Sequence, residues 1–159
     1  MSEELDVRYV TLSDMAVASA LGFGKEPELE AARMLTAFTR KLGFSPGLPG
    51  HPSYGFNNPN TSSGNENYGY ELWCQVDPNT KAEPPIKIKH VPGARYAVTR
   101  FTGLPNIGRV WKRFSAWFED HHGNTPPCTI QCWLESLQTS DEPDPEKWVF
   151  DLYLAVDRP

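Results

Sequence analysis

AVASALG at residues 16–22 and AVTRFTG at residues 97–103 are two versions of one stretch, and this stretch decides the fold. Each version is followed by a helical pattern and then by two strand-like runs. These runs cover 70–76 and 86–90 in the first copy, and 130–135 and 150–154 in the second. The shared order predicts a duplicated strand–helix–strand–strand unit, which buries its apolar face against its twin.

The duplication predicts a single α+β domain over residues 1–159. The two pseudo-repeats run over about 15–91 and 95–156. We expect them to form one antiparallel sheet with two helices on one face. Because the seam between twin units is a natural place for a pocket, we also expect a ligand cleft between them.

The composition limits the classes of partner and the compartment. The 159 residues are 39% hydrophobic and carry a formal charge of −5 at pH 7. That charge disfavours nucleic acid as a partner. No apolar run reaches the roughly 18 residues that cross a bilayer, and the acidic N-terminus has no signal-peptide pattern. We therefore expect a cytoplasmic protein with no membrane partner.

Two helices follow from hydrophobic periodicity and from glycine stops. The first starts after Gly24, has Pro27 in its first turn and ends at Gly43. Its predicted buried stripe is Ala31, Leu35, Phe38 and Leu42. The second closes at Gly123, and its predicted stripe is Ile107, Val110, Trp111, Phe114, Trp117 and Phe118.

Residues 44–67 have no periodicity and are rich in Pro, Gly, Asn and Ser. They predict a long loop, and long loops in compact domains are often functional. Tyr54 and Phe56 lie in it. Both rings could be loop anchors, or they could form a wall or lid of the cleft.

The strand runs alternate between an aliphatic side and a side with tryptophan and glutamate. In 70–76 the second side carries Glu71 and Trp73, and in 130–137 it carries Trp133 and Glu135. We expect the aliphatic sides to pack against the helices. The opposite sides then line a ligand-binding concavity, to which the last strand adds Tyr153 from the face that also carries Asp151.

The chain resembles the gyrase-inhibitor-like (GyrI-like) small-molecule-binding domain, which is also the effector domain of multidrug-sensing transcription regulators. The resemblance covers nearly the whole chain and depends on the order of several loose motifs. These are GHPSYGFNNP at 50–59, YELW at 70–73, VPGARYAV at 91–98, TG at 102–103, WKRFSAW at 111–117, LE at 134–135 and DLYLAV at 151–156.

The resemblance implies an antiparallel sheet made of two strand–helix–strand–strand units with a ligand channel between them. It also implies that Glu135 is the central pocket glutamate. Two residues later the family usually has an aromatic side chain, and this chain has Leu137. No DNA-binding domain is expected before it, so the resemblance is to a stand-alone member.

Several of these residues also have a purely structural interpretation. Glu135 could be an exposed strand acid or could pair with Arg95 or Arg100. Trp73 and Trp133 could be core residues, and Trp111 and Trp117 lie on a helical stripe that favours the core. Lys87 and Lys89 are interpreted as a solvated strand face.

No metal or cofactor is expected. His121 and His122 fit a helix C-terminus, where positive charge is favoured. The three cysteines imply no disulfide framework, and Cys128 and Cys132 are interpreted as small core residues. The sequence has no Gly-rich phosphate loop, nucleotide motif or Ser-His-Asp pattern.

Three functions remain open. The first is a binding module for an amphipathic, aromatic small molecule that can carry a positive charge, held by Glu135 among aromatic rings. The second is a hydrolase that opens cyclopropane-bearing electrophiles, as some stand-alone relatives do, with Glu135 directing water. The third, an inhibitor that binds DNA gyrase, rests on the resemblance alone. An edge strand could support a homodimer. The predicted ligand-binding residues are Tyr54, Phe56, Glu71, Trp73, Trp111, Trp133, Glu135 and Tyr153.

Overall fold

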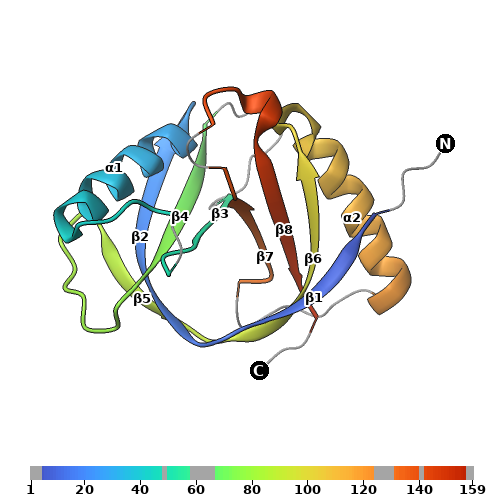
Figure 1. Ribbon diagram of the computed structural model, residues 1–159, viewed down its shortest axis with the longest axis horizontal. Helices are drawn as coiled ribbons and strands as arrows, with labels where there is room; N and C mark the ends of the chain where they lie inside the picture. Colours follow the sequence, from blue (N-terminus) through green and yellow to red (C-terminus); the bar gives the residue numbers. More distant parts are fainter. Residues whose placement is uncertain (1–4, 48–49, 58–66, 124–130, 140–141, 157–159) are drawn as a thin grey trace. The chain divides into compact units, whose positions relative to one another are not determined.

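The computed structural model describes residues 5–47, 50–57, 67–123, 131–139 and 142–156. The chain divides into two compact units, and each is described by itself. The first unit comprises residues 14–91, and the second comprises residues 1–13 and 92–159. In the described residues each unit has one long helix and four antiparallel strands, which confirms the predicted α+β class (Figure 1).

The first unit runs β2 (Met15–Gly24), α1 (Pro27–Leu42), β3 (Ser53–Asn57), β4 (Tyr68–Val76) and β5 (Lys87–Val91). Strand β4 pairs with β3 and β2, and β2 pairs with β5 on its other edge. The spatial order is therefore β3-β4-β2-β5. Strand β3 lies inside the region predicted as one long loop, so that prediction is wrong for Ser53–Asn57.

The second unit has the same plan, completed by the N-terminal strand. Its elements are β1 (Val7–Leu12), β6 (Ala94–Thr102), a 3-10 turn η1 (Leu104–Asn106), α2 (Ile107–His122), β7 (Trp133–Leu137), a 3-10 turn η2 (Pro145–Lys147) and β8 (Val149–Ala155). The order β1-β6-β8-β7 follows from the antiparallel pairs. Strand β1 thus takes the place that β5 has in the first unit.

This topology corrects the way in which the repeats were matched. The sequence aligned 70–76 with 130–135, which would make β4 the counterpart of β7. In the structure β4 lies between β2 and β3, and β8 lies between β6 and β7. Strand β4 therefore corresponds to β8, and β3 corresponds to β7.

Both helices form where their periodicity predicts them. Helix α1 starts at Pro27, and Gly43 ends it with a φ of 91° while its N–H donates to Thr39 and Arg40 carbonyls. Left-handed φ values are costly for residues with a Cβ, which explains glycine at this position. Leu42, predicted to be buried, is 46% exposed, so that the buried residues of α1 end at Phe38 and Thr39.

Each helix covers one face of its own strands. Ala31, Leu35 and Phe38 of α1 pack against a small-residue row on β2 and against Cys74 and Val76 of β4. In the second unit Val110, Phe114 and Phe118 of α2 pack against Ala97 and Leu152. These clusters fix which face of each sheet is covered, and hence which side chains are left for another role.

The cysteines differ from one another. Cys132 is disulfide-bonded, so its interpretation as a small core thiol is wrong. Cys128 lies outside the described residues. Cys74 is a free thiol with no exposed surface, and burial raises its pKa to about 11.

Cys74 is therefore expected to resist alkylation in the folded protein. The thiolate is the reactive form, and with a pKa above the working pH almost none is present at pH 8. Iodoacetamide treatment without a reductant, followed by peptide mass spectrometry, should leave Cys74 unmodified in buffer and modified in 6–8 M urea, roughly the range that unfolds small domains. Labelling in buffer at the rate of a free cysteine would contradict the buried environment.

Candidate functional site

The predicted central acid, Glu135, lies on β7 on the side that α2 covers. It is paired with Leu152 across the sheet, and Leu152 belongs to the cluster packed under α2. Directly paired residues share a face, so Glu135 and its neighbour Trp133 face α2. The prediction that they lie opposite the helices is wrong. Leu134 and Ser136 are buried on the other face, so both faces of β7 are covered and alternation alone could not assign them.

Two indole rings adjoin the Glu135 carboxylate. The Trp111 Nε1–H of α2 donates to Glu135 Oε2 at 3.0 Å. The Trp111 and Trp133 rings meet edge to face, with centroids 5.6 Å apart. All three side chains are partly exposed. The structure thus brings together three of the predicted site residues from a helix and a strand.

A surface depression lies on the α2 side of the same unit. It has a volume of about 240 Å³, and its lining includes Phe118 and Gly123 near the C-terminal end of α2, together with Cys132 and Leu154. Leu154 is the cross-strand partner of Trp133, so the depression and Trp133 share a face of the sheet. Trp111, Trp133 and Glu135 are not among its lining residues.

Four other predicted residues meet in the first unit, on the side of β4 opposite α1. Tyr54 lies across from Trp73, and Phe56 lies across from Glu71. The Phe56 and Trp73 rings meet edge to face at 4.9 Å. The sequence assigned this face of β4 correctly, because Leu72, Cys74 and Val76 are the residues that pack toward α1.

Glu71 already has several partners. Its Oε2 accepts hydrogen bonds from Ser19 Oγ at 2.8 Å, Trp73 Nε1 at 2.5 Å and Lys89 Nζ at 2.6 Å. The carboxylate is buried, and Lys89 supplies its counter-charge from β5. Lys89 was interpreted as part of a solvated strand face; its side chain is 41% exposed, but it also pairs with this buried acid. This acid joins three strands and is buried, whereas Glu135 is partly exposed.

Tyr153 is separated from Glu135 by the sheet itself. It pairs with Leu134 and Val98 on the face away from α2, where its ring meets Tyr96 edge to face at 5.8 Å. Arg95 and Arg100 have other partners than Glu135. The Arg95 guanidinium lies 4.8 Å above the Tyr9 ring, and Arg100 pairs with Asp151.

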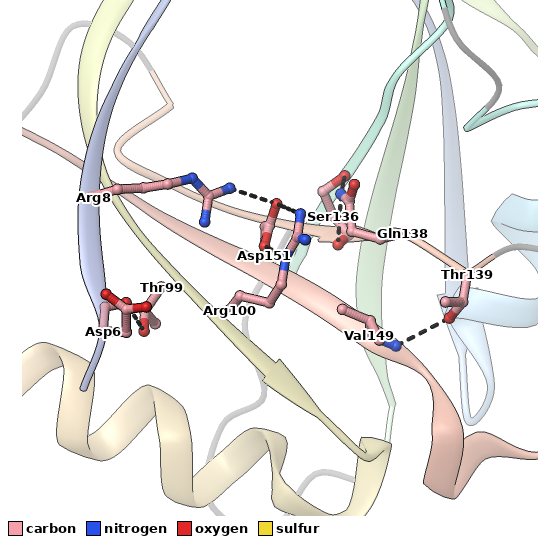
Figure 2. Close-up of polar contacts among 9 residues, drawn as sticks. All are labelled: Asp6, Arg8, Thr99, Arg100, Ser136, Gln138, Thr139, Val149 and Asp151. Carbon is pink, nitrogen blue, oxygen red and sulfur yellow. Dashed lines mark hydrogen bonds and ion pairs between the residues drawn. The ribbon is translucent and has the colours of Figure 1, made fainter. Parts of the chain in front are cut away.

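The pairing of Arg8 and Arg100 with Asp151 is the polar cluster that the sequence did not reveal (Figure 2). Alternation along the last strand put Asp151 on the correct face. The two arginines come from β1 and β6, and only the register of those strands brings them to the same carboxylate. No local motif could have shown it.

The described residues contain neither a metal-ligand cluster nor a membrane-spanning helix. They contain no group of three or more His, Cys, Asp or Glu side chains that could hold a metal ion. None of their helices is long and apolar enough to cross a membrane.

Solved structures similar to this chain support the fold. The C-terminal domain of EcmrR has a TM-score of 0.73 at 12% identity, covering 98% of this chain and 99% of that domain. SAV2435 bound to tetraphenylphosphonium has a TM-score of 0.63 at 12% identity, covering 96% of this chain and 94% of that chain. A hydrolase encoded by lin2189 from Listeria innocua has a TM-score of 0.66 at 12% identity, covering 97% of this chain and 93% of that chain.

A comparison with curated proteins gives no match. The family model of the integron-associated effector binding protein, Cass2, matches residues 8–156, which is nearly the whole chain. The chain therefore belongs to the family of integron-associated effector-binding proteins.

Proposed function

We propose that this protein binds an amphipathic aromatic cation, and that Glu135, Trp111 and Trp133 hold it. The single observation that carries the proposal is a partly exposed carboxylate that accepts a hydrogen bond from one indole, with a second indole packed edge to face against the first. Membership of an effector-binding family and a similar fold in a protein solved with tetraphenylphosphonium support the same ligand class.

The chemistry of the three side chains suits such a ligand. Indole faces attract cations through their quadrupole and offer a large apolar area for aromatic rings. A carboxylate neutralises a cation that leaves water, and this removes most of the cost of burying the charge. The Trp111 N–H holds the carboxylate in position before the ligand arrives.

Replacement of Glu135 by glutamine tests the proposal. Glutamine keeps the size and an oxygen that can accept from Trp111, and it removes the charge. Binding of tetraphenylphosphonium, followed by tryptophan quenching, should weaken by about 1–3 kcal/mol, roughly 5- to 150-fold. Triphenylphosphine oxide, which is neutral, should be affected far less.

The matched control is Glu146→Gln, which makes the same change at an exposed position in the same unit. It should leave the affinity for the cation within a factor of about two, because a solvated charge at a distance is screened. Equal affinities of wild type and Glu135→Gln for the cation, with the fold intact, would show that Glu135 is not the binding group.

A hydrolase is the second candidate, and the similar fold of the Listeria innocua hydrolase favours it. In that case Glu135 directs water onto an electrophilic, cyclopropane-bearing substrate. Glu135→Gln should then reduce turnover by roughly 100-fold or more while leaving substrate binding nearly unchanged. Product detection by mass spectrometry separates the two functions, since a pure binding module returns the ligand unaltered.

A further inference from the structure

The face of the second unit opposite α2 carries a charge cluster that the proposed function does not use. Asp151, 2% exposed, lies in the middle of β8. Arg8 Nη2 of β1 donates to its Oδ2 at 2.9 Å, and Arg100 of β6 donates through Nε at 2.8 Å and Nη2 at 3.0 Å. Figure 2 shows both arginines pointing toward this one carboxylate.

The cluster contains two positive charges and one negative charge. Two guanidiniums share a single carboxylate, and among the described residues neither has another ion pair. The exposed carboxylate of Asp6, two residues before Arg8, forms none with them. Hydrogen bonding to Asp151 raises the pKa of Arg100, so this arginine stays charged at any working pH. The net charge of the three groups is therefore +1.

The first unit contains a buried acid with a single cation. Lys89 lies opposite Val17 of β2, just as Arg8 lies opposite Val98 of β6. Two residues further along the central strands, the first unit has Ser19, opposite Trp73, and the second has Arg100, opposite Asp151. The two acids therefore hold different positions, but Glu71 is neutralised by one lysine, with hydrogen bonds from the neutral Ser19 and Trp73 side chains, whereas Asp151 has two arginines. Neutralising a buried acid does not require a second guanidinium.

The guanidinium N–H groups of Arg8 and Arg100 that do not bind Asp151 are positioned by it and are accessible to solvent. A guanidinium has five N–H donors, and Asp151 takes one from Arg8 and two from Arg100. The side chains of Arg8 and Arg100 are 46% and 54% exposed. The buried carboxylate fixes both forks, so that little side-chain entropy is lost when another group binds them.

We infer that Arg8 and Arg100 form a binding site for an oxyanion group, the carboxylate or phosphate of a small ligand. Guanidinium forks match such groups in geometry as well as in charge. The site lies on the face opposite the one that carries Glu135, and it goes beyond the proposed cation-binding function. The net charge of the chain, −5, repels anions. Anion binding at this site therefore depends on the two guanidiniums and not on the charge of the whole chain.

The test uses benzoate and inorganic phosphate as separate probes, titrated into the full chain at low ionic strength. Two-dimensional NMR should show a saturable shift of the Arg8 and Arg100 side-chain Nε–H signals with at least one probe. The probe that binds more tightly tells a carboxylate ligand from a phosphate ligand. Arg100→Gln and Arg8→Gln should each weaken that binding at least tenfold.

The control is Arg40→Gln, which removes the same charge at an exposed position on α1 of the other unit. It should leave anion binding within a factor of two. Arg8→Gln and Arg100→Gln each leave Asp151 with one arginine, so both variants are expected to fold. Thermal melting checks this, and if one variant is unfolded, the binding result of the other variant decides. Absence of saturable shifts with both probes, or equal weakening by Arg40→Gln, would overturn the assignment. Unchanged tetraphenylphosphonium binding in Arg100→Gln keeps this test independent of the proposed function.

Discussion

Replacing Gly22 by alanine is expected to lower the free energy of unfolding by about 3 kcal/mol or more, at the upper end of overpacking effects. Gly22 lies near the end of β2, where the chain approaches the first turn of α1. A Cβ there would stand 2.1 Å from the Pro27 carbonyl oxygen and 3.1 Å from the Ala31 nitrogen. Both are backbone atoms of the helix, so no flexible side chain can give way and α1 must move off the sheet.

Gly108 provides a matched control, because the same substitution there is expected to raise the free energy of unfolding. It lies in the first turn of α2, and a Cβ built there meets nothing within 4 Å. Alanine at that position should stabilise the protein by about 0.5–1 kcal/mol, because glycine is the poorer helix former. Urea unfolding followed by circular dichroism measures both variants. Similar stabilities of Gly22→Ala and wild type would mean that α1 does not pack this closely on β2.

The helices were the most predictable part of the fold. Their apolar periodicity and their glycine stops are local properties, and the structure reproduces α1 and α2 almost to the residue. The faces of β4 were also predictable, since only one of them packs against a helix. Alternation is informative whenever one side is aliphatic and the other is polar.

The faces of β7 could not be assigned in the same way. Leu134 and Ser136 are as buried as the residues under α2, so the side on which Glu135 lies depended on the register of β7 with β8. Strand β3 has five residues and two of its central side chains are aromatic, among loop-forming neighbours. Its pairing with β4, and not its own sequence, makes it a strand.

The polar clusters were hidden for a related reason. Arg8 belongs to β1, which comes before the first unit in the sequence, and Lys89 belongs to β5, an edge strand that pairs with β2 and not with the preceding β4. A lysine in an alternating strand normally points to solvent, and its partner is set by long-range pairing alone. The sequence could place Glu71 and Asp151 on a face, but it could not say which cations neutralise them.

Replacing Glu71 by alanine is expected to destabilise the protein by about 3–5 kcal/mol, as is usual when one partner of a buried ion pair is removed. The Ser19 hydroxyl and the Trp73 N–H would lose the acceptor that they share, and Lys89 would lose its counter-charge. Each buried donor left without a partner adds a desolvation cost. Thermal and urea unfolding measure the loss.

Glu83 provides a comparison in which the ion pair is exposed and the carboxylate has one partner among the described residues. It pairs with Lys41 at 2.6 Å, the same distance as in the Glu71–Lys89 pair, but its side chain is 55% exposed and that of Lys41 is 64% exposed. Glu83→Ala should cost no more than about 1 kcal/mol, because water solvates both charges and salt screens them. If the two alanine variants were equally stable, the Glu71 carboxylate would have to be solvated in solution, and its three hydrogen bonds could not be what joins β2, β4 and β5. A loss confined to Glu71→Ala would instead show that this acid, which was predicted to bind a ligand, is committed to the fold.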